Sequence, residues 1–291
     1  MHTVTAVLAA LSAALTFAVA TSLQHRVAGS VPETARTAGL MRHVLGRPMW
    51  VAGMSCSVVA LGLDAVAVHE GALALVQPIL VTGIVFALPV RAALERRRPS
   101  AGELVAAAVT SAGLAVFLVA AQPSAGSAAD IRAAVLLVAA GAVIAAVIAS
   151  AGFRVQTGHA RGVLIGCAGG VVGGLVAGTL KLAVTTQTGV VVWLVLPTLV
   201  VLGCWGVVLN QQAYRSAPLA VSMPIVNIVG PIVAIAMGYA VFGEVPNHRP
   251  AELAVEVIGL ILVGAGLHRL AMTTDAPGQP VRSQSPESEL V

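Results

Sequence analysis

Charged side chains are scarce in this sequence. Asp, Glu, Lys and Arg make up only 10% of its 291 residues, whereas roughly one quarter of a typical soluble domain is charged. Hydrophobic residues make up 58%, and the mean hydropathy is +0.94. This balance excludes an ordinary water-soluble domain. It predicts an all-α integral membrane protein whose main partner is the lipid bilayer.

Cysteine is also rare, and the three cysteines (Cys56, Cys167 and Cys204) lie in separate apolar stretches. Their positions indicate neither a disulfide framework nor a Cys/His metal site. The sequence also lacks a nucleotide-phosphate loop, a nucleophile triad and a His-rich metal motif. We therefore expect no enzymatic activity, no bound cofactor and no ATP-driven transport, and the sequence leaves the identity of any metal ligand unknown.

Lysine is almost absent, since Lys181 is the only lysine among sixteen basic residues. A net charge of +4 at pH 7 could indicate a nucleic-acid partner, but the arginines lie between the apolar stretches. An excess of Lys and Arg is normal for the cytoplasmic loops of membrane proteins, so no nucleic acid is required. The preference for Arg over Lys, with abundant Ala, Val and Gly, is typical of a GC-rich bacterial genome.

Nine apolar segments are each close to the ~20 residues that cross a bilayer. They are residues 3–23, 50–68, 71–90, 103–121, 131–151, 162–183, 189–211, 217–242 and 251–270. The first segment could be a signal peptide, but it has no basic residue at its head, so we expect a retained helix. The polar residues 271–291 predict a disordered cytoplasmic tail.

The basic residues 24–49 are too charged to cross the bilayer. A capping-box pattern from Ser30 to Glu33 and an amphipathic pattern after it favour a short helix on the membrane surface. A solvated loop is the alternative. With the N-terminus outside and the C-terminus in the cytoplasm, all the basic residues except Arg132, Lys181 and Arg249 fall on the cytoplasmic side.

An internal repeat is visible when Pro78 is aligned with Pro224. Asp64 then matches Asn210, and in each half a proline-containing helix is followed by a helix that begins with Glu-Leu. The matched helices are five spans apart and so cross the membrane in opposite directions, as in the inverted repeats of secondary transporters. The first repeat covers residues 1–121 with four spans, and the second covers residues 131–270 with five.

Two segments carry a resemblance to a known family. They are RPMWVAGMSCSVVALGLDAVAVHEGALALVQP, which ends at Pro78, and LNQQAYRSAPLAVSMPIVNIVGPIVAIAMGYAVFGE, which ends at Glu244. With the Gly259 to Gly266 helix, they resemble the drug/metabolite transporter (DMT) superfamily, EamA-like, and are most similar to the branch of NIPA-type magnesium transporters and related bacterial permeases. That branch usually has Asn at the position of Asp64 and a Gly-Glu pair at Gly62-Leu63. The resemblance implies an inverted-repeat fold and transport of a solute or of magnesium.

Polar and helix-breaking residues mark the expected substrate path. In the 217–242 span, small residues and prolines recur every three or four positions and so share one face, and each proline frees a backbone carbonyl. Asp64 is a carboxylate inside the second span, about one turn from its outer end, and a charge at such depth is costly and so indicates function. A structural acid near the membrane interface is its alternative, and interfacial amides are the alternative for Asn210 and Gln211. The path residues are Asp64, Gln77, Pro78, Asn210, Gln211, Pro224, Asn227 and Pro231.

Lys181 could form an ion pair with Asp64 or Glu70, or could extend to the lipid headgroups. In the same span, small residues recur every fourth position, which lets another helix pack closely. These are Gly166, Gly170, Gly174 and Gly178. These glycines predict packing within the bundle, and the alternative is that they form the contact face of a homodimer.

The sequence favours a permease of the bacterial inner membrane that moves a small solute by alternating access. Asp64 is then the expected proton or cation site. The alternatives are a magnesium or other divalent-cation carrier, and a membrane protein that assists assembly or a lipid pathway without transporting anything.

Overall fold

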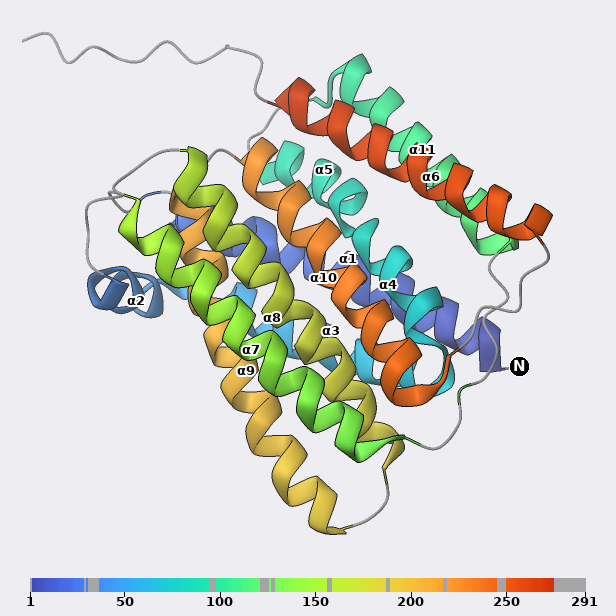
Figure 1. The fold of residues 1–291 in the computed structure, drawn as a ribbon. Helices are drawn as coiled ribbons and strands as arrows, with labels where there is room; N and C mark the ends of the chain where they lie inside the picture. Colours follow the sequence, from blue (N-terminus) through green and yellow to red (C-terminus); the bar gives the residue numbers. More distant parts are fainter. Residues whose placement is uncertain are drawn as a thin grey trace, which may run out of the picture.

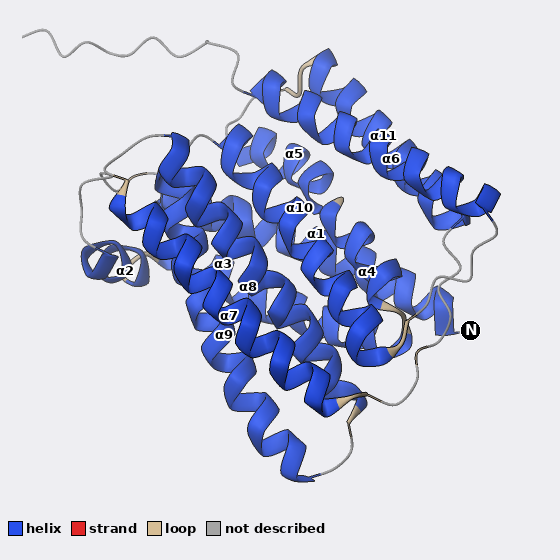
Figure 2. Ribbon diagram, in the orientation of Figure 1, coloured by secondary structure: helices blue, strands red, loops and turns tan. Residues whose placement is uncertain are grey.

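The computed structural model describes residues 2–28, 30, 37–94, 98–120, 126, 129–155, 159–186, 189–216, 219–244 and 250–274. All regular secondary structure in these ranges is helical (Figure 2), so the prediction of an all-α fold is confirmed. The helices are α1 (His2–Ala28), α2 (Thr37–Leu45), α3 (Pro48–Glu70), α4 (Leu73–Val81), α5 (Gly83–Leu94), α6 (Ala101–Ala120), α7 (Ile131–Arg154), α8 (His159–Thr185), α9 (Gly189–Ser216), α10 (Leu219–Phe242) and α11 (Pro250–Thr274).

Six helical segments within the described residues are long and apolar enough to cross a membrane. They are Thr3–Ala28, Pro48–Glu70, Leu73–Leu94, Ile131–Arg154, Ala160–Thr185 and Trp193–Tyr214. The protein is therefore a helical membrane protein. The other three predicted spans coincide with α6, α10 and α11, of which α6 and α10 contain shorter apolar segments, Ala101–Phe117 and Ile228–Phe242.

The single span predicted over residues 71–90 is two helices in the structure. The chain turns at Thr82, whose N–H and hydroxyl groups both donate to the carbonyl of Ile79, at 3.1 and 2.6 Å. Bonds to a residue three positions back tighten the last turn of α4 and end it. Gly83 then starts α5 close to α1, where a Cβ atom would lie 3.0 Å from the carbonyl oxygen of Ala14.

The basic segment 24–49 contains the end of α1, all of α2 and the start of α3. The helical interpretation holds for α2, whose Leu40 and Val44 are fully buried against Val27 and Trp50. Leu45, the last residue of α2, is 60% exposed. Residues 31–36, which include most of the predicted capping box, lie outside the described residues, as does 275–291 of the predicted tail. Residues 271–274 of that tail belong to α11.

The bundle contains two similar helix arrangements (Figure 1). α1 packs along α3 in the antiparallel sense, since Gly53 lies against Ala20 and Gly71 lies against Ala6. α1 also runs beside α4 and α5. In the same way, α8 packs along α9 and runs beside α10.

The helices α6 and α11 form a third unit, at the upper right of Figure 1. Their backbones touch where small residues face each other. A Cβ atom at Gly113 would lie 2.7 Å from the backbone nitrogen of Val263, and one at Gly259 would lie 2.7 Å from that of Phe117. Glycine is needed at both positions because any side chain would separate the two helices.

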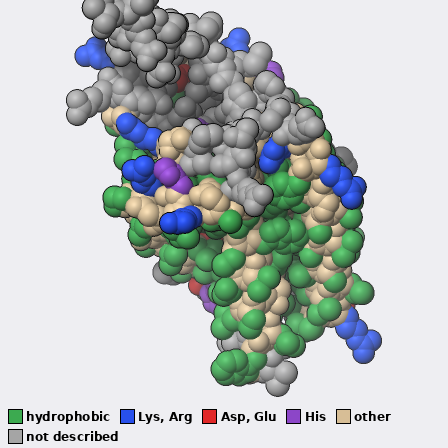
Figure 3. All heavy atoms as spheres, turned by 90° about the vertical axis from the view of Figure 1, so that its left-hand side faces the viewer, with side chains coloured by type: hydrophobic (Ala, Val, Ile, Leu, Met, Phe, Trp, Pro, Cys, Tyr) green, Lys and Arg blue, Asp and Glu red, His purple; other side chains and the backbone are tan. Residues whose placement is uncertain are grey.

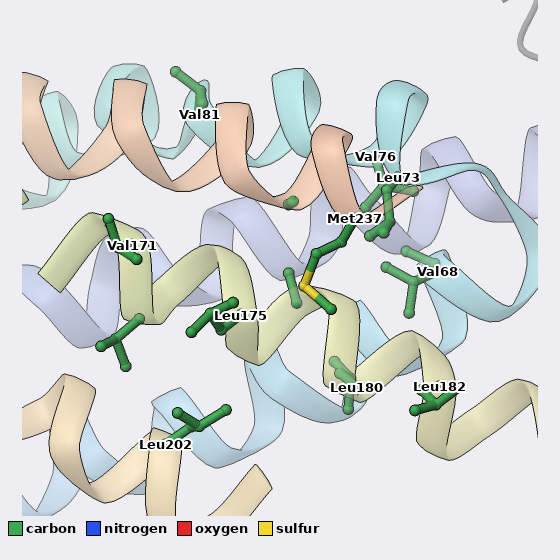
Figure 4. Close-up of a cluster of buried hydrophobic side chains, with 14 of the residues drawn as sticks. Val68, Leu73, Val76, Val81, Val171, Leu175, Leu180, Leu182, Leu202 and Met237 are labelled. Carbon is green, nitrogen blue, oxygen red and sulfur yellow. The ribbon is translucent and has the colours of Figure 1, made fainter. Parts of the chain in front are cut away.

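Buried aliphatic side chains from α3, α4, α8, α9 and α10 form the main core. In Figure 4, Met237 extends from α10 toward α8 among Leu175, Leu180 and Leu73. Apolar side chains also cover the outside of the bundle, for example Leu136 on α7 and Trp193 on α9, which are 70% and 81% exposed. On the face drawn in Figure 3, hydrophobic side chains cover the lower part and most Lys and Arg side chains lie near the upper end. This distribution suits a bundle surrounded by lipid.

Candidate functional site

Polar groups follow one face of α3 through the interior of the bundle. Ser57, Asp64 and Gly71 are spaced by seven residues, so they lie on one side of the helix, about 10 Å apart along its axis. Ala60 and Ala67, between them on the same face, are fully buried. Asp64 is only 5% exposed, and its Oδ1 atom has no hydrogen-bond partner. The structure therefore places a buried carboxylate inside a membrane-spanning helix, as the sequence predicts.

At one end of this face, amide side chains join three helices. Gln24 of α1 donates from Nε2 to the hydroxyl of Ser57 at 2.8 Å, and its Oε1 accepts from Nε2 of Gln211 on α9 at 3.1 Å. Gln212 donates to the hydroxyl of Thr37 on α2. Gln24, Gln211 and Gln212 are buried. We call Gln24, Ser57, Gln211, Gln212 and Thr37 the amide cluster.

At the other end, an ion pair joins α8 to Glu244, which lies just beyond the end of α10. Lys181 forms a salt bridge with Glu244 and donates to the carbonyl oxygen of Gly71 at 2.8 Å. Glu244 also accepts from the backbone N–H of Leu73, at 2.9 Å. The ammonium lies 5.3 Å from the centre of the Phe242 ring, within the range of a cation–π contact. Both charged side chains are almost completely shielded from solvent, at 10% and 1% exposure.

The chain turn after α10 positions Glu244. Gly243 has a φ of 61°, a conformation that glycine adopts readily and other residues avoid. Its N–H donates to Tyr239, and the N–H of Glu244 donates to Gly238. The bond from Gly243 to the residue four positions back is the bond of the αL motif that often ends a helix. The turn directs the carboxylate of Glu244 back toward Gly238 and Leu73.

Between the amide cluster and the ion pair, three helices bury polar atoms that have no hydrogen-bond partner. These atoms are Oδ1 of Asp64 on α3, Nε2 of Gln77 on α4 and Oγ1 of Thr179 on α8. A buried polar group without a partner typically costs about 1–3 kcal/mol. Groups of this kind in a membrane bundle indicate a place where water, an ion or a solute is bound.

The predicted path residues separate into groups. Gln77 and Pro78 are buried in α4. Asn210 is on α9, and its Oδ1 atom is buried against Gly169 without a partner. Gln211 belongs to the amide cluster. Pro231 is half-buried on α10, while the side chains of Pro224 and Asn227 lie outside the described part of the structure.

The partner of Lys181 differs from the prediction. The sequence left open an ion pair with Asp64 or Glu70 and a side chain extended to the headgroups, and the structure shows a pair with Glu244. Since Lys181 binds the carbonyl of Gly71, its ammonium lies about 10 Å along α3 from Asp64, too far for a pair. Glu244 is 63 residues away in sequence. Only the close approach of α8 and α10 brings the two charges together.

That approach depends on the glycines of α8. Cβ atoms at Gly170, Gly174 and Gly178 would meet Val229, Val233 and Met237 of α10 at under 3 Å. Gly166 is buried. The structure therefore places the glycine strip against another helix of the same chain. Among the described residues, no group of three or more His, Cys, Asp or Glu side chains could hold a metal ion.

Comparison with known proteins shows which family the chain belongs to. No family model matches the sequence, and no solved structure matches it. The chain is 32% identical over 282 residues to an uncharacterized protein (Cgl0250/cg0304) of Corynebacterium glutamicum, covering 94% of this chain and 96% of that protein. With this identity over nearly the full length of both, the chain belongs to the same family as the Corynebacterium glutamicum protein.

Proposed function

We propose that this protein is a secondary transporter that moves a small solute across the bacterial inner membrane by alternating access, with the architecture of the drug/metabolite transporter superfamily. The observation that carries the proposal is the buried carboxylate of Asp64, whose Oδ1 atom has no hydrogen-bond partner among the described residues. It lies inside the membrane-spanning segment Pro48–Glu70, between the amide cluster and the Lys181–Glu244 pair. A charge inside a span is costly, about 2.5–3.5 kcal/mol at the centre of the helix on insertion scales, and such residues typically serve ion or substrate pathways.

Helix packing supports nine spans in two inverted repeats. α1, α3, α4 with α5, and α6 correspond to α8, α9, α10 and α11, because, apart from contacts with α2 and α7, each helix has the same neighbours as its counterpart. The start of α1, at Ala6, and the end of α8, at Lys181, both lie against Gly71. These two equivalent helices therefore run in opposite directions, as an inverted repeat requires. In this correspondence α7 is the additional helix.

The positions of the basic residues support an orientation with the N-terminus outside and the C-terminus in the cytoplasm. Arg26 donates to the carbonyl of Leu94 at 3.0 Å, which brings the ends of α1 and α5 together. Arg98 follows α5, and Arg154 ends α7. We assign this end to the cytoplasm, since cytoplasmic loops are rich in Lys and Arg. The Lys181–Glu244 pair then lies near the outer surface of the membrane.

The test is transport by the purified protein in proteoliposomes. A thermal-shift screen of metabolites and divalent ions first identifies a ligand, because a compound that binds the native state raises its stability. Uptake of that ligand is then measured, and a pH-sensitive dye inside the vesicles reports any protons that move with it. We expect Asp64→Asn to abolish coupled proton movement or flux. Asp130→Asn is the matched control, because Asp130 is an exposed N-cap and Asn caps equally well.

Two other outcomes would replace the proposal. Selective flux of Mg²⁺, unaffected by metabolites, would identify the divalent-cation carrier. If no ion or metabolite crosses the membrane while a stoichiometric protein partner co-purifies, the protein has an assembly or lipid-pathway role. If Asp64→Asn leaves flux unchanged across a pH range, Asp64 is not the coupling site.

A further inference from the structure

Three segments that are distant in sequence meet at the Lys181–Glu244 pair. Lys181 is near the end of α8, Glu244 follows α10, and Gly71 and Leu73 form the turn between α3 and α4 (Figure 1). The first two segments belong to the second proposed repeat, and the turn belongs to the first. The pair therefore holds the two repeats together at one end of the bundle.

The polypeptide around the pair separates it from bulk solvent. A Cβ atom at Gly126 would lie 3.2 Å from the Cγ of Glu244, so Gly126 packs against this side chain. The N–H of Asp130 donates to the carbonyl of Val241 at 2.8 Å and joins the start of α7 to the end of α10. A second contact between the repeats lies nearby, where Nδ1 of His69 is 3.1 Å from the carbonyl oxygen of Val184.

The opposite end of the bundle is closed by uncharged groups. α1 and α8 both contain 27 residues, and Gln24 and Lys181 occupy the same position along them. Gln24 bonds to Ser57 of the first repeat and to Gln211 of the second. At equivalent positions, an amide therefore joins the repeats at the basic end, and an ammonium joins them at the other end.

We propose that the Lys181–Glu244 pair is a latch that keeps the outer end of the protein closed and separates each time that end opens. This inference rests on the proposed alternating access. Attraction between the two charges is strong only while the site is dry, because water weakens it many-fold. Entry of water also restores the hydration that each ion lost on burial. The pair is thus bistable, either closed and dry or open and wet, as a gate requires.

The experiment measures access from the outside and needs no substrate. Cys56, Cys167 and Cys204 are replaced by Ser, and Ala67→Cys is introduced. Ala67 is fully buried on α3, one turn deeper than Gly71. Right-side-out membrane vesicles are treated with a charged, membrane-impermeant methanethiosulfonate.

Two control variants accompany the assay. Thr185→Cys, exposed at the end of α8, reports that the reagent is active. Arg98→Cys, exposed at the basic end, reports that the vesicles are sealed.

With the pair intact, we expect Ala67→Cys to react slowly. Glu244→Gln leaves the Lys181 charge unpaired and should accelerate modification by about tenfold or more. Lys181→Arg retains the charge and its donors and should leave the rate within about twofold of the parent.

Three results would overturn the latch. The first is equal protection of Ala67→Cys with and without Glu244→Gln. The second is equally fast modification of the intact protein and of Glu244→Gln. The third is failure of both Glu244→Gln and Lys181→Met to accumulate in the membrane, since a contact that breaks in every cycle has to be dispensable for folding. Accelerated modification in a protein that transports nothing would instead reject the proposed function and retain the gate.

Discussion

Alanine at Gly174 tests how closely α8 and α10 pack. A Cβ atom at this position would lie 2.5 Å from the carbonyl oxygen of Gly230 and 2.5 Å from the Cβ of Val233. Neither atom can rotate away, because the first belongs to the backbone and the second is fixed to it. The helices would have to separate to accept one methyl group. Since Lys181 and Glu244 come from these two elements, their separation would also strain the ion pair.

Two opposing effects determine how much Gly174→Ala changes the free energy of unfolding. Replacing glycine by alanine inside a helix typically gains about 0.5–1 kcal/mol, whereas overpacking a tight core typically costs about 1–3 kcal/mol. We expect a net loss of about 1–2 kcal/mol for Gly174→Ala. Gly173→Ala is the matched control, because nothing lies within 4 Å of its added Cβ. It should leave stability unchanged or raise it by up to ~1 kcal/mol. The stability of Gly178→Ala should lie between those of Gly173→Ala and Gly174→Ala, since its Cβ meets the flexible side chain of Met237.

The assay is thermal unfolding of detergent-purified protein, followed by the loss of the monodisperse peak in size-exclusion chromatography after heating. A loss of 1–2 kcal/mol should lower the midpoint by about 2–8 °C. The expected order of stability is Gly173→Ala, then Gly178→Ala, then Gly174→Ala. Equal midpoints for Gly173→Ala and Gly174→Ala, or a Gly174→Ala protein as stable as the parent, would refute the close packing of α8 against α10.

Two further substitutions test other contacts in the same assay. Gly243→Ala places a side chain at a φ of 61° and should cost about 1–2 kcal/mol, with Gly243→Asn less harmful. Equal stability of the two variants would argue against the helix-ending turn that positions Glu244. Gly259→Ala should also destabilise by about 1–3 kcal/mol, since its Cβ would lie 2.7 Å from the backbone of Phe117. Gly264→Ala, with open space around it, is the control. A neutral Gly259→Ala would refute the packing of α6 on α11.

The local properties of the chain determined the helices. Uncharged apolar runs have to satisfy their backbone groups internally in a bilayer, so composition alone predicts both the all-α class and the membrane setting. Each of the nine predicted spans coincides with one helix or, for residues 71–90, with two. The break at Thr82 was not predictable, because it depends on hydrogen bonds to Ile79 and on the contact of Gly83 with α1. Asp64 was identifiable because a carboxylate inside an apolar span is unusual wherever the helix lies.

The contacts between helices were decided by the tertiary structure alone. The amide cluster combines Gln24 and Gln211, which are 187 residues apart, and no pattern in either helix indicates the other. Glu244 lay at the end of a recognised motif, but nothing local connected it to Lys181. Sequence periodicity shows which face of a helix is polar or small. Which faces meet is set by the packing of whole helices, so the amide cluster and the Lys181–Glu244 pair were visible only in the folded protein.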